Sequence, residues 1–249
     1  MRRAQQFIWT GFMVALTACV GVSAEQKQQA VAHSKLGYAF MEEGLFQQAF
    51  VEYQKAQTAN PRDKTVHYAL GHLYFRQERW LDASREFETA VRLDPTYSDG
   101  HNYLGVAHQQ MGRTEEAILH LRKALENPEW PTPHLAHHSL GLIMLAASRL
   151  DEAAEEFRYA LRTQSNYLPA HIMLGEVYAR QDRYDEAIKK YKETITLAPN
   201  YEDAHYSLGL AYLKVGDKPL AIAELKRVLE LVPGSTLARK ARQALDAVK

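Results

Sequence analysis

Histidines recur at a fixed spacing along this 249-residue chain, and an imidazole can bind a metal ion or change its charge near neutral pH. Six of them lie 34 or 36 residues apart: His33, His67, His101, His137, His171 and His205. Equivalent side chains on adjacent helices lie on the order of 10 Å apart. That distance is too large for two of them to share one ion, so we expect these six residues to pack between helices.

A second group of histidines has the spacing of a helical chelate. His134, His137 and His138 follow an i, i+3, i+4 pattern, which places three side chains on one face of a helix. No carboxylate or cysteine completes a ligand set nearby in the sequence. We therefore predict no metal site and no other cofactor.

Motifs of the common enzyme classes are missing from the chain. It contains no Gly-x-Ser-x-Gly, no His-Glu-x-x-His, no phosphate-binding loop and no Gly-x-Gly-x-x-Gly. The 30 basic residues balance 30 acidic ones, and no basic stripe stands out. Because nucleic-acid binding requires such a stripe, we expect no nucleic-acid partner. The composition indicates a non-catalytic chain.

The histidines belong to a longer repeated pattern, which is most regular at a Leu-Gly dipeptide. This dipeptide occurs at Leu36-Gly37, Leu70-Gly71, Leu104-Gly105, Leu140-Gly141, Leu174-Gly175 and Leu208-Gly209. The spacings are 34, 34, 36, 34 and 34 residues, a period typical of stacked helix-turn-helix units. Counting Leu-Gly as positions 7 and 8, the six repeats begin at Ala30, Lys64, Ser98, His134, Leu168 and Glu202.

The residue types within each repeat predict two helices that pack closely. Positions 4, 7, 8 and 11 share one face of a first helix, and positions 20, 24 and 27 share one face of a second. Gly at position 8 and Ala at position 20 permit close approach, and a large residue at position 24 fills the remaining space. Turn residues fall near position 15, and proline at position 32 ends the unit in four repeats.

This pattern resembles the tetratricopeptide repeat over residues 30–233. The resemblance implies an all-α fold, an α-solenoid of six repeats in a right-handed superhelix, with a groove lined by the first helices. Residues 235–248 form a basic amphipathic segment that we expect to cap the last repeat. Residues 25–249 are thus predicted to form a single repeat domain.

The same resemblance implies which side chains line the groove. The candidate peptide-binding residues are Tyr38, Tyr68, His72, Phe75, Arg76, Asn102, Gln109 and Tyr206. The lysine and asparagine with which some members of the class clamp a peptide carboxylate are missing at the corresponding positions. Rigid aromatic rings suit an extended or helical apolar peptide instead. The alternative is that some of these rings pack against adjacent helices.

Residues 1–24 have the composition of an export signal. Arg2 and Arg3 precede a short apolar stretch, residues 7–16, which is too short to span a bilayer comfortably. Leu16-Thr17-Ala18-Cys19 resembles the bacterial lipobox, in which the cysteine is lipidated, and Cys19 is the single cysteine of the chain. Cleavage after Ala24 by an ordinary signal peptidase is the alternative. The first interpretation predicts a lipid anchor on the periplasmic face of the outer membrane, and the second a soluble periplasmic protein.

One repeat boundary differs from the others by two extra residues. They lie in Asn127-Pro128-Glu129-Trp130-Pro131-Thr132-Pro133, which we expect to be an extended, stiff connector that presents Trp130 as a contact residue. Together with the lipobox and six repeats, this insertion resembles the pilotin lipoproteins of type IV pilus biogenesis. The resemblance implies an adaptor that assists assembly of a secretin or pilus. A general periplasmic scaffold for cytochrome or peptidoglycan assembly is the alternative.

Overall fold

The computed structural model describes residues 21–248, and over this range the chain forms thirteen α-helices and no β-strand. The helices are α1 Ala24–Glu42, α2 Phe46–Ala59, α3 Lys64–Arg76, α4 Trp80–Leu93, α5 Ser98–Gln110, α6 Thr114–Ala124, α7 Pro133–Ala146, α8 Leu150–Thr163, α9 Leu168–Arg180, α10 Tyr184–Leu197, α11 Glu202–Val215, α12 Lys218–Leu231 and α13 Thr236–Asp246. The predicted all-α repeat architecture is confirmed. Cys19 and the apolar stretch before it lie outside the described residues.

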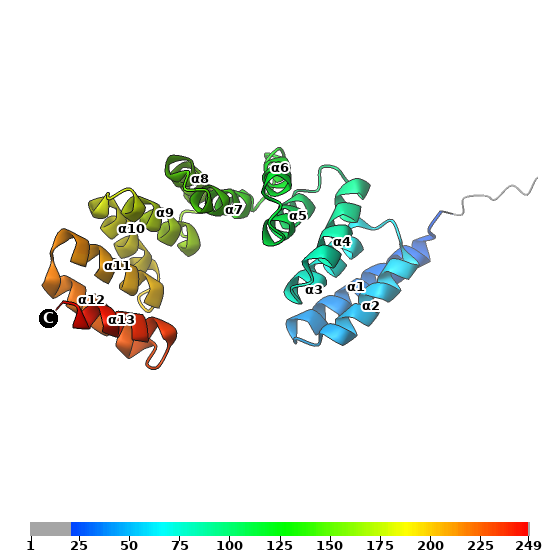
Figure 1. Ribbon diagram of the computed structural model, residues 1–249. Coiled ribbons are helices and arrows are strands. Elements are labelled where there is room, and N and C mark those ends of the chain that lie inside the picture. The colour runs from blue at the N-terminus through cyan, green and yellow to red at the C-terminus, as the bar shows by residue number, and fades with distance from the viewer. Residues whose placement is uncertain (1–20, 249) are drawn as a thin grey trace, which may run out of the picture.

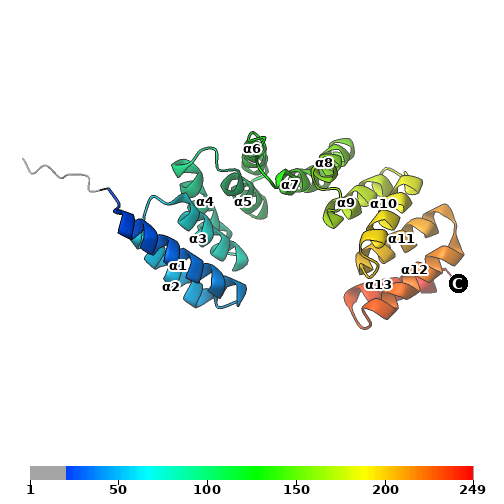
Figure 2. The same ribbon diagram turned by 180° about the vertical axis from the view of Figure 1, so that it is seen from behind.

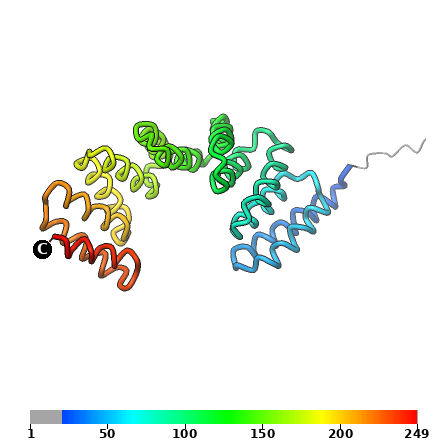
Figure 3. The backbone as a smooth tube through the Cα atoms, viewed as in Figure 1, coloured from blue at the N-terminus to red at the C-terminus, as the bar shows by residue number. Residues whose placement is uncertain are grey.

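The helices form a single curved array rather than a globule. Figure 1 shows an arch with α1 and α2 at one end and α12 and α13 at the other, and the view from behind in Figure 2 shows the same succession. Each helix contacts only helices one or two places away in the chain order. Figure 3 traces the backbone as a series of helical hairpins, each of which is one repeat.

The turn inside each repeat depends on one residue with a left-handed backbone conformation. This residue stands at position 15 in all six repeats: Gly44, Glu78, Gly112, Ser148, Asp182 and Gly216. Glycine adopts this conformation freely, whereas other residues lose about 1 kcal/mol. The tight turn is retained in three repeats whose residue at this position is not glycine.

The contact between the two helices of a repeat follows the predicted logic. A Cβ atom added at Gly37 would lie 2.6 Å from the ring of Tyr53, and one added at Gly141 would lie 2.6 Å from the ring of Phe157. The large residue at position 24 thus lies directly against the glycine at position 8. Alanine at position 20 is fully buried in every repeat. Any side chain at position 8 would push the two helices apart. The close approach of the helices therefore explains why glycine occurs at this position in every repeat.

The two ends of the array are formed differently. Helix α1 begins six residues before the first repeat, where Ser23 accepts a hydrogen bond from the backbone N–H of Gln26 and caps the helix. Helix α13 begins after the N-cap residue Ser235 and buries Ala238 and Ala241 against α12. Within residues 21–248, no helix combines the length and apolar character needed to cross a bilayer.

Candidate functional site

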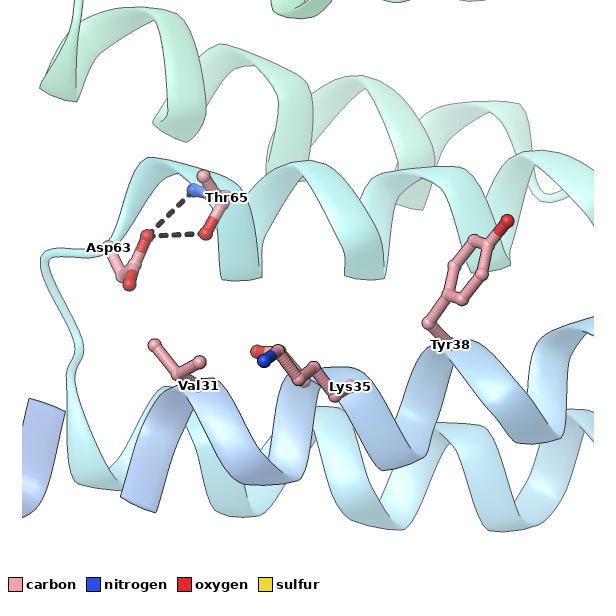
Figure 4. A pocket seen from close by; sticks show the side chains of 6 residues that line it. Val31, Lys35, Tyr38, Asp63 and Thr65 are labelled. Carbon is pink, nitrogen blue, oxygen red and sulfur yellow. Dashed lines mark hydrogen bonds between the residues drawn. The ribbon is translucent and has the colours of Figure 1, made fainter. Parts of the chain in front are cut away.

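A cleft lies between the first helices of repeats one and two. It has a volume of about 310 Å³ and is lined by Val31, Ser34, Lys35, Tyr38, Asp63 and Thr65. Figure 4 shows Val31, Lys35 and Tyr38 on α1 opposite Asp63 and Thr65 at the start of α3. Asp63 caps α3 by accepting hydrogen bonds from the N–H and hydroxyl of Thr65, at 2.9 and 2.6 Å. Tyr38 is 61% exposed, so its ring is open to a partner.

Helix α3, which forms one side of this cleft, also contributes to a continuous aromatic cluster of rings from α3 to α5. The cluster consists of Tyr68, His72, Phe75, Phe87, Tyr97 and Tyr103. Tyr103 lies at its centre, with ring centroids 5.6 Å from Tyr68, 5.2 Å from His72 and 5.7 Å from Phe75. The structure therefore brings three predicted groove residues together through a fourth that the sequence did not single out.

Phe87 is fully buried, the other five rings of the cluster are half-buried, and the cluster is uncharged at neutral pH. Burial raises the pKa of the Tyr68 hydroxyl and lowers the pKa of the His72 imidazole. Because the rings pack edge to face, they hold one another in fixed orientations. Part of the predicted groove surface is thus used for packing between repeats two and three, and its remaining exposed area is rigid and largely apolar.

Other predicted groove residues have different environments. Arg76 is exposed and lies 5.8 Å from the ring of Phe46, and Gln109 is half-buried. Asn102 is only 3% exposed, and its side-chain oxygen is buried without a hydrogen-bond partner. We therefore correct its assignment: Asn102 lies in the interior of the array, where a peptide cannot reach it, because the neighbouring repeats cover that face of α5.

Trp130 was expected to contact a partner, but its side chain lies in the core. It is 5% exposed and packs among buried residues of α6 and α7, including Leu121 and Leu140. Its indole N–H donates to the Asp99 carboxylate at 2.9 Å. Trp130 therefore fastens the connector to α5 and offers no surface to a partner in this conformation.

The connector also differs from the expected extended segment. Helix α6 has 11 residues, whereas the other second helices have 14, and residues after Ala124 form two consecutive turns. Asn127 accepts a hydrogen bond from the backbone N–H of Glu129 at 3.0 Å, and the carbonyl of Asn127 accepts one from the N–H of Trp130. These turns fold the segment back so that the indole reaches the core.

Tyr206 lies apart from the other candidate residues. It lines a pocket of about 580 Å³ formed by α9, α10, α11 and α13, together with Ile172, Tyr191 and Leu210. This pocket shares no lining residue with the cleft at Tyr38. The predicted groove thus contains two separate concave regions, one near each end of the array.

The position-4 histidines pack between helices, as expected; four of them are buried, His33 and His137 are half-buried, and most pair with a carboxylate. In four repeats Nδ1 lies 2.6–2.7 Å from a glutamate 19 residues later, in the pairs His33–Glu52, His67–Glu86, His137–Glu156 and His205–Glu224. In the fifth repeat His171 lies 3.4 Å from Glu193. Each such pair joins the two helices of one repeat. The regular His-to-Glu spacing was present in the sequence and could have predicted them.

Three of these imidazoles, those of His67, His171 and His205, also bind the segment that precedes their repeat. Nε2 of His67 lies 3.0 Å from the carbonyl oxygen of Pro61, and Nε2 of His205 lies 2.9 Å from that of Pro199. A carbonyl oxygen only accepts hydrogen bonds, so each Nε2 donates. For His67, the hydrogen bond with Glu86 raises the pKa of the imidazole. This histidine therefore connects three segments of backbone.

In repeat three, the residue 19 positions after the position-4 histidine is His120, where four other repeats have the glutamate. Nδ1 of His101 lies 3.1 Å from Nδ1 of His120, and the ring of His108 stacks on His120 at a centroid distance of 5.6 Å. Burial lowers the pKa of His101 and His108, and it lowers the pKa of His120 to about 4. The three rings are therefore neutral at pH 7. We call this group the histidine triad.

The His134 group does not converge on one point. His137 pairs with Glu156, whereas His134 and His138 both pack edge-on against Tyr167, at 4.9 and 5.4 Å. Among residues 21–248 no set of three histidine, cysteine or acidic side chains is arranged to hold a metal ion.

Comparison with known proteins establishes the class. Family models of the tetratricopeptide repeat match residues 68–132, 144–190, 175–216 and 202–234. These segments together cover more than half of the chain, and their helices have the repeat geometry described above. The chain belongs to the tetratricopeptide repeat proteins.

Its similarity to particular relatives is more specific. It is 28% identical over 163 residues to the type IV pilus assembly protein PilF of Pseudomonas aeruginosa, an alignment that covers 61% of this chain and 64% of PilF, less than two thirds of that protein. A Haemophilus influenzae protein described as uncharacterized is 27% identical over 143 residues, which cover 56% of this chain and 80% of that one.

Solved structures of two pilus proteins share the fold. The structure reported for the functional characterization of P. aeruginosa PilF superimposes with a TM-score of 0.79 at 20% identity, covering 88% of this chain and 99% of that one. The crystal structure of PilW, described as a widely conserved type IV pilus biogenesis factor, gives a TM-score of 0.80 at 18% identity, covering 86% and 99%. The chain is therefore a tetratricopeptide repeat protein similar to type IV pilus biogenesis factors, and such a scaffold implies protein–protein interaction.

Proposed function

We propose that this chain is a non-catalytic adaptor that binds a component of a secretin or type IV pilus during assembly. The observation that carries the proposal is the exposed ring of Tyr38, which lines a cleft between α1 and α3, together with the rigid aromatic cluster to which α3 contributes. Preorganised aromatic surfaces bind peptides with little loss of conformational entropy. The similarity to PilF supports the choice of partner class.

The proposal includes an anchor at the outer membrane. A lipid on Cys19 would hold the array at the periplasmic face, with α1 beginning five residues after the cysteine. Mass spectrometry of the mature protein tests this part. We expect an N-terminal lipidated Cys19, whereas a free amine at Glu25 would contradict the anchor and favour a soluble periplasmic protein.

A pull-down with the C-terminal region of the secretin as prey tests the binding surface. We expect Tyr38→Glu to reduce recovery at least about tenfold, because it places a charge on the exposed ring position without disturbing the core. Leu81→Glu is the matched control, since Leu81 is exposed at 48% on α4, a second helix. Its recovery should equal that of the wild type.

Two outcomes would contradict the proposal. Equal recovery by Tyr38→Glu and the wild type would exclude this surface. Recovery of cytochrome or peptidoglycan assembly proteins, rather than pilus components, from the native envelope would favour the general scaffold. A double variant, Tyr68→Ala with Phe75→Ala, tests the aromatic cluster separately, with circular dichroism to verify that its helices persist.

A further inference from the structure

The pocket near the C-terminal end has a chemistry that differs from that of the Tyr38 cleft. Its floor is apolar, with Ile172 and Ala211 buried and Leu210 half-buried. Three tyrosines, Tyr184, Tyr191 and Tyr206, complete the wall. A volume of about 580 Å³ is sufficient for one or two large apolar side chains.

The rim of this pocket carries an excess of positive charge. Three cations, Arg180, Lys214 and Lys240, line it together with one carboxylate, Glu176. Arg180 pairs with Glu176 at 2.5 Å, so these two charges offset each other. Lys214 and Lys240 are exposed and make no ion pair with any residue in the range 21–248. Two ammonium groups therefore remain available above an apolar floor.

One further carboxylate interacts with this rim. Asp203 on α11 is close enough to Lys240 to offset part of its charge, but it does not line the pocket. The Tyr38 cleft, by comparison, has one lysine and one aspartate among its lining residues. The C-terminal pocket and the Tyr38 cleft therefore differ in the charge of their lining residues.

Lys240 lies on α13, so this helix does more than cap the end of the array. The capping contacts of this helix come from Ala238 and Ala241, with Leu237 and Leu245 beside them. Lys240 takes no part in that apolar contact and stands instead at the rim of the pocket. Helix α13 therefore closes the last repeat and also supplies a charge to the surface between α9, α11 and itself.

We propose that this C-terminal pocket binds an acidic peptide segment of a partner protein, with one apolar side chain on the floor and carboxylates at Lys214 and Lys240. Charge complementarity favours this occupant, because opposite charges around an apolar contact increase both association rate and specificity. The pocket is separate from the Tyr38 surface, so the inference stands independently of the pilus assignment.

Selection from a phage-displayed library of random nonapeptides on the full-length protein tests the proposal. We expect the selected peptides to be enriched in Asp or Glu next to Leu, Phe or Tyr. Fluorescence anisotropy with the best labelled peptide should then show at least about tenfold weaker binding to Lys214→Glu with Lys240→Glu. The neutral pair Lys214→Gln with Lys240→Gln should weaken binding by a smaller factor.

The controls separate this site from other positive or aromatic surfaces. Lys189→Glu with Lys218→Glu makes the same change of net charge at exposed residues outside the pocket, and we expect it to bind within about twofold of wild type. Tyr38→Glu should also bind normally, which distinguishes this pocket from the cleft of the proposed function. Selection of peptides without acidic bias, or binding that survives both lysine pairs, would overturn the inference.

Discussion

The pKa of the position-4 histidine is shifted in opposite directions in two neighbouring repeats of this chain, upward for His67 and downward for His101. His67 donates from Nε2 to a carbonyl oxygen and faces a glutamate with Nδ1, so the doubly protonated imidazolium satisfies both contacts. In the histidine triad, His101 makes the same carbonyl contact but faces His120, and all three rings have a lowered pKa. One residue type thus stabilises adjacent repeats over different pH ranges.

The contributions of His67 and of the histidine triad to the stability of the fold depend on pH in opposite directions. The raised pKa of His67 means that its pairing stabilises the fold fully below its ordinary pKa of 6.5, and this contribution is lost as pH rises through the folded pKa. The triad contributes fully above 6.5, and its contribution is lost as pH falls toward about 4, the folded pKa of His120. Mild acid should therefore destabilise repeat three, and also repeat four, where burial lowers the pKa of His138 to about 4.

Replacement of His120 by glutamate should remove the acid sensitivity of repeat three. The change restores the His–Glu pair found in other repeats, and the carboxylate would stabilise protonated His101. Protonation of His120 should cost the wild-type protein on the order of 2 kcal/mol of unfolding free energy between pH 7 and pH 4.5, and the His120→Glu variant should lose less. Urea unfolding at several pH values measures the difference.

The outcome can be assigned to the triad with a matched variant. Glu86→Gln removes the carboxylate that faces His67 and should lower stability more at pH 6 than at pH 8, where the imidazole has less charge. Identical pH profiles for wild type and His120→Glu would show that the triad does not titrate within this range.

At the scale of helices, the sequence predicted the fold better than it predicted the surface. The Leu-Gly dipeptide, the alanine at position 20 and the turn at position 15 are each required by a contact between adjacent segments, so their period was sufficient to predict the six hairpins. Residues at surface positions are not restricted in this way. Asn102 and Tyr206 occupy groove positions by register, but neighbouring repeats bury the first and leave the second in a separate pocket.

The missed residues have the same explanation. Tyr103 became central because rings from α3, α4 and α5 converge on it, and Lys240 reached a pocket because α13 packs beside α11. Both depend on contacts between different repeats, which a pattern within one repeat does not describe. The fold of Trp130 into the core likewise required the two turns after α6.

The buried position of Trp130 in the connector can be tested by substitution. Trp130→Ala removes a buried ring between α6 and α7 and should lower the unfolding free energy by about 3 kcal/mol, since the cavity cannot close without moving α7. Trp130→Phe keeps most of the volume but loses the hydrogen bond to Asp99 and should cost about 1 kcal/mol. Thermal unfolding by circular dichroism compares them, and equal loss from both variants would contradict the packing role.

The whole molecule is stabilised by contacts between neighbouring units, so damage at one end should remain local. Removal of residues 235–249 uncovers Leu225 and Val228, which are fully buried beneath α13. We expect a fall in melting temperature of roughly 5 °C and faster hydrogen exchange in α11 and α12. Exchange in α2 and α3 should be unchanged.

A shorter truncation is the control for this experiment. Removal of residues 247–249 leaves Ala238 and Ala241 in place and should have little effect on the melting temperature. Equal loss of protection along the entire array after the longer truncation would show that the repeats unfold as one cooperative unit.

The restriction of every helix contact to helices one or two places away has a consequence for cooperativity. With contacts this local, the chain has a low contact order, and no part of α1 to α3 communicates directly with α9 to α13. A partner that occupied both the Tyr38 cleft and the C-terminal pocket would supply the long-range contact that the described helices lack. Such a partner would couple the unfolding of the N-terminal repeats to the unfolding of the C-terminal repeats. If the two ends unfold in separate transitions in the free protein, we expect a single transition in the complex.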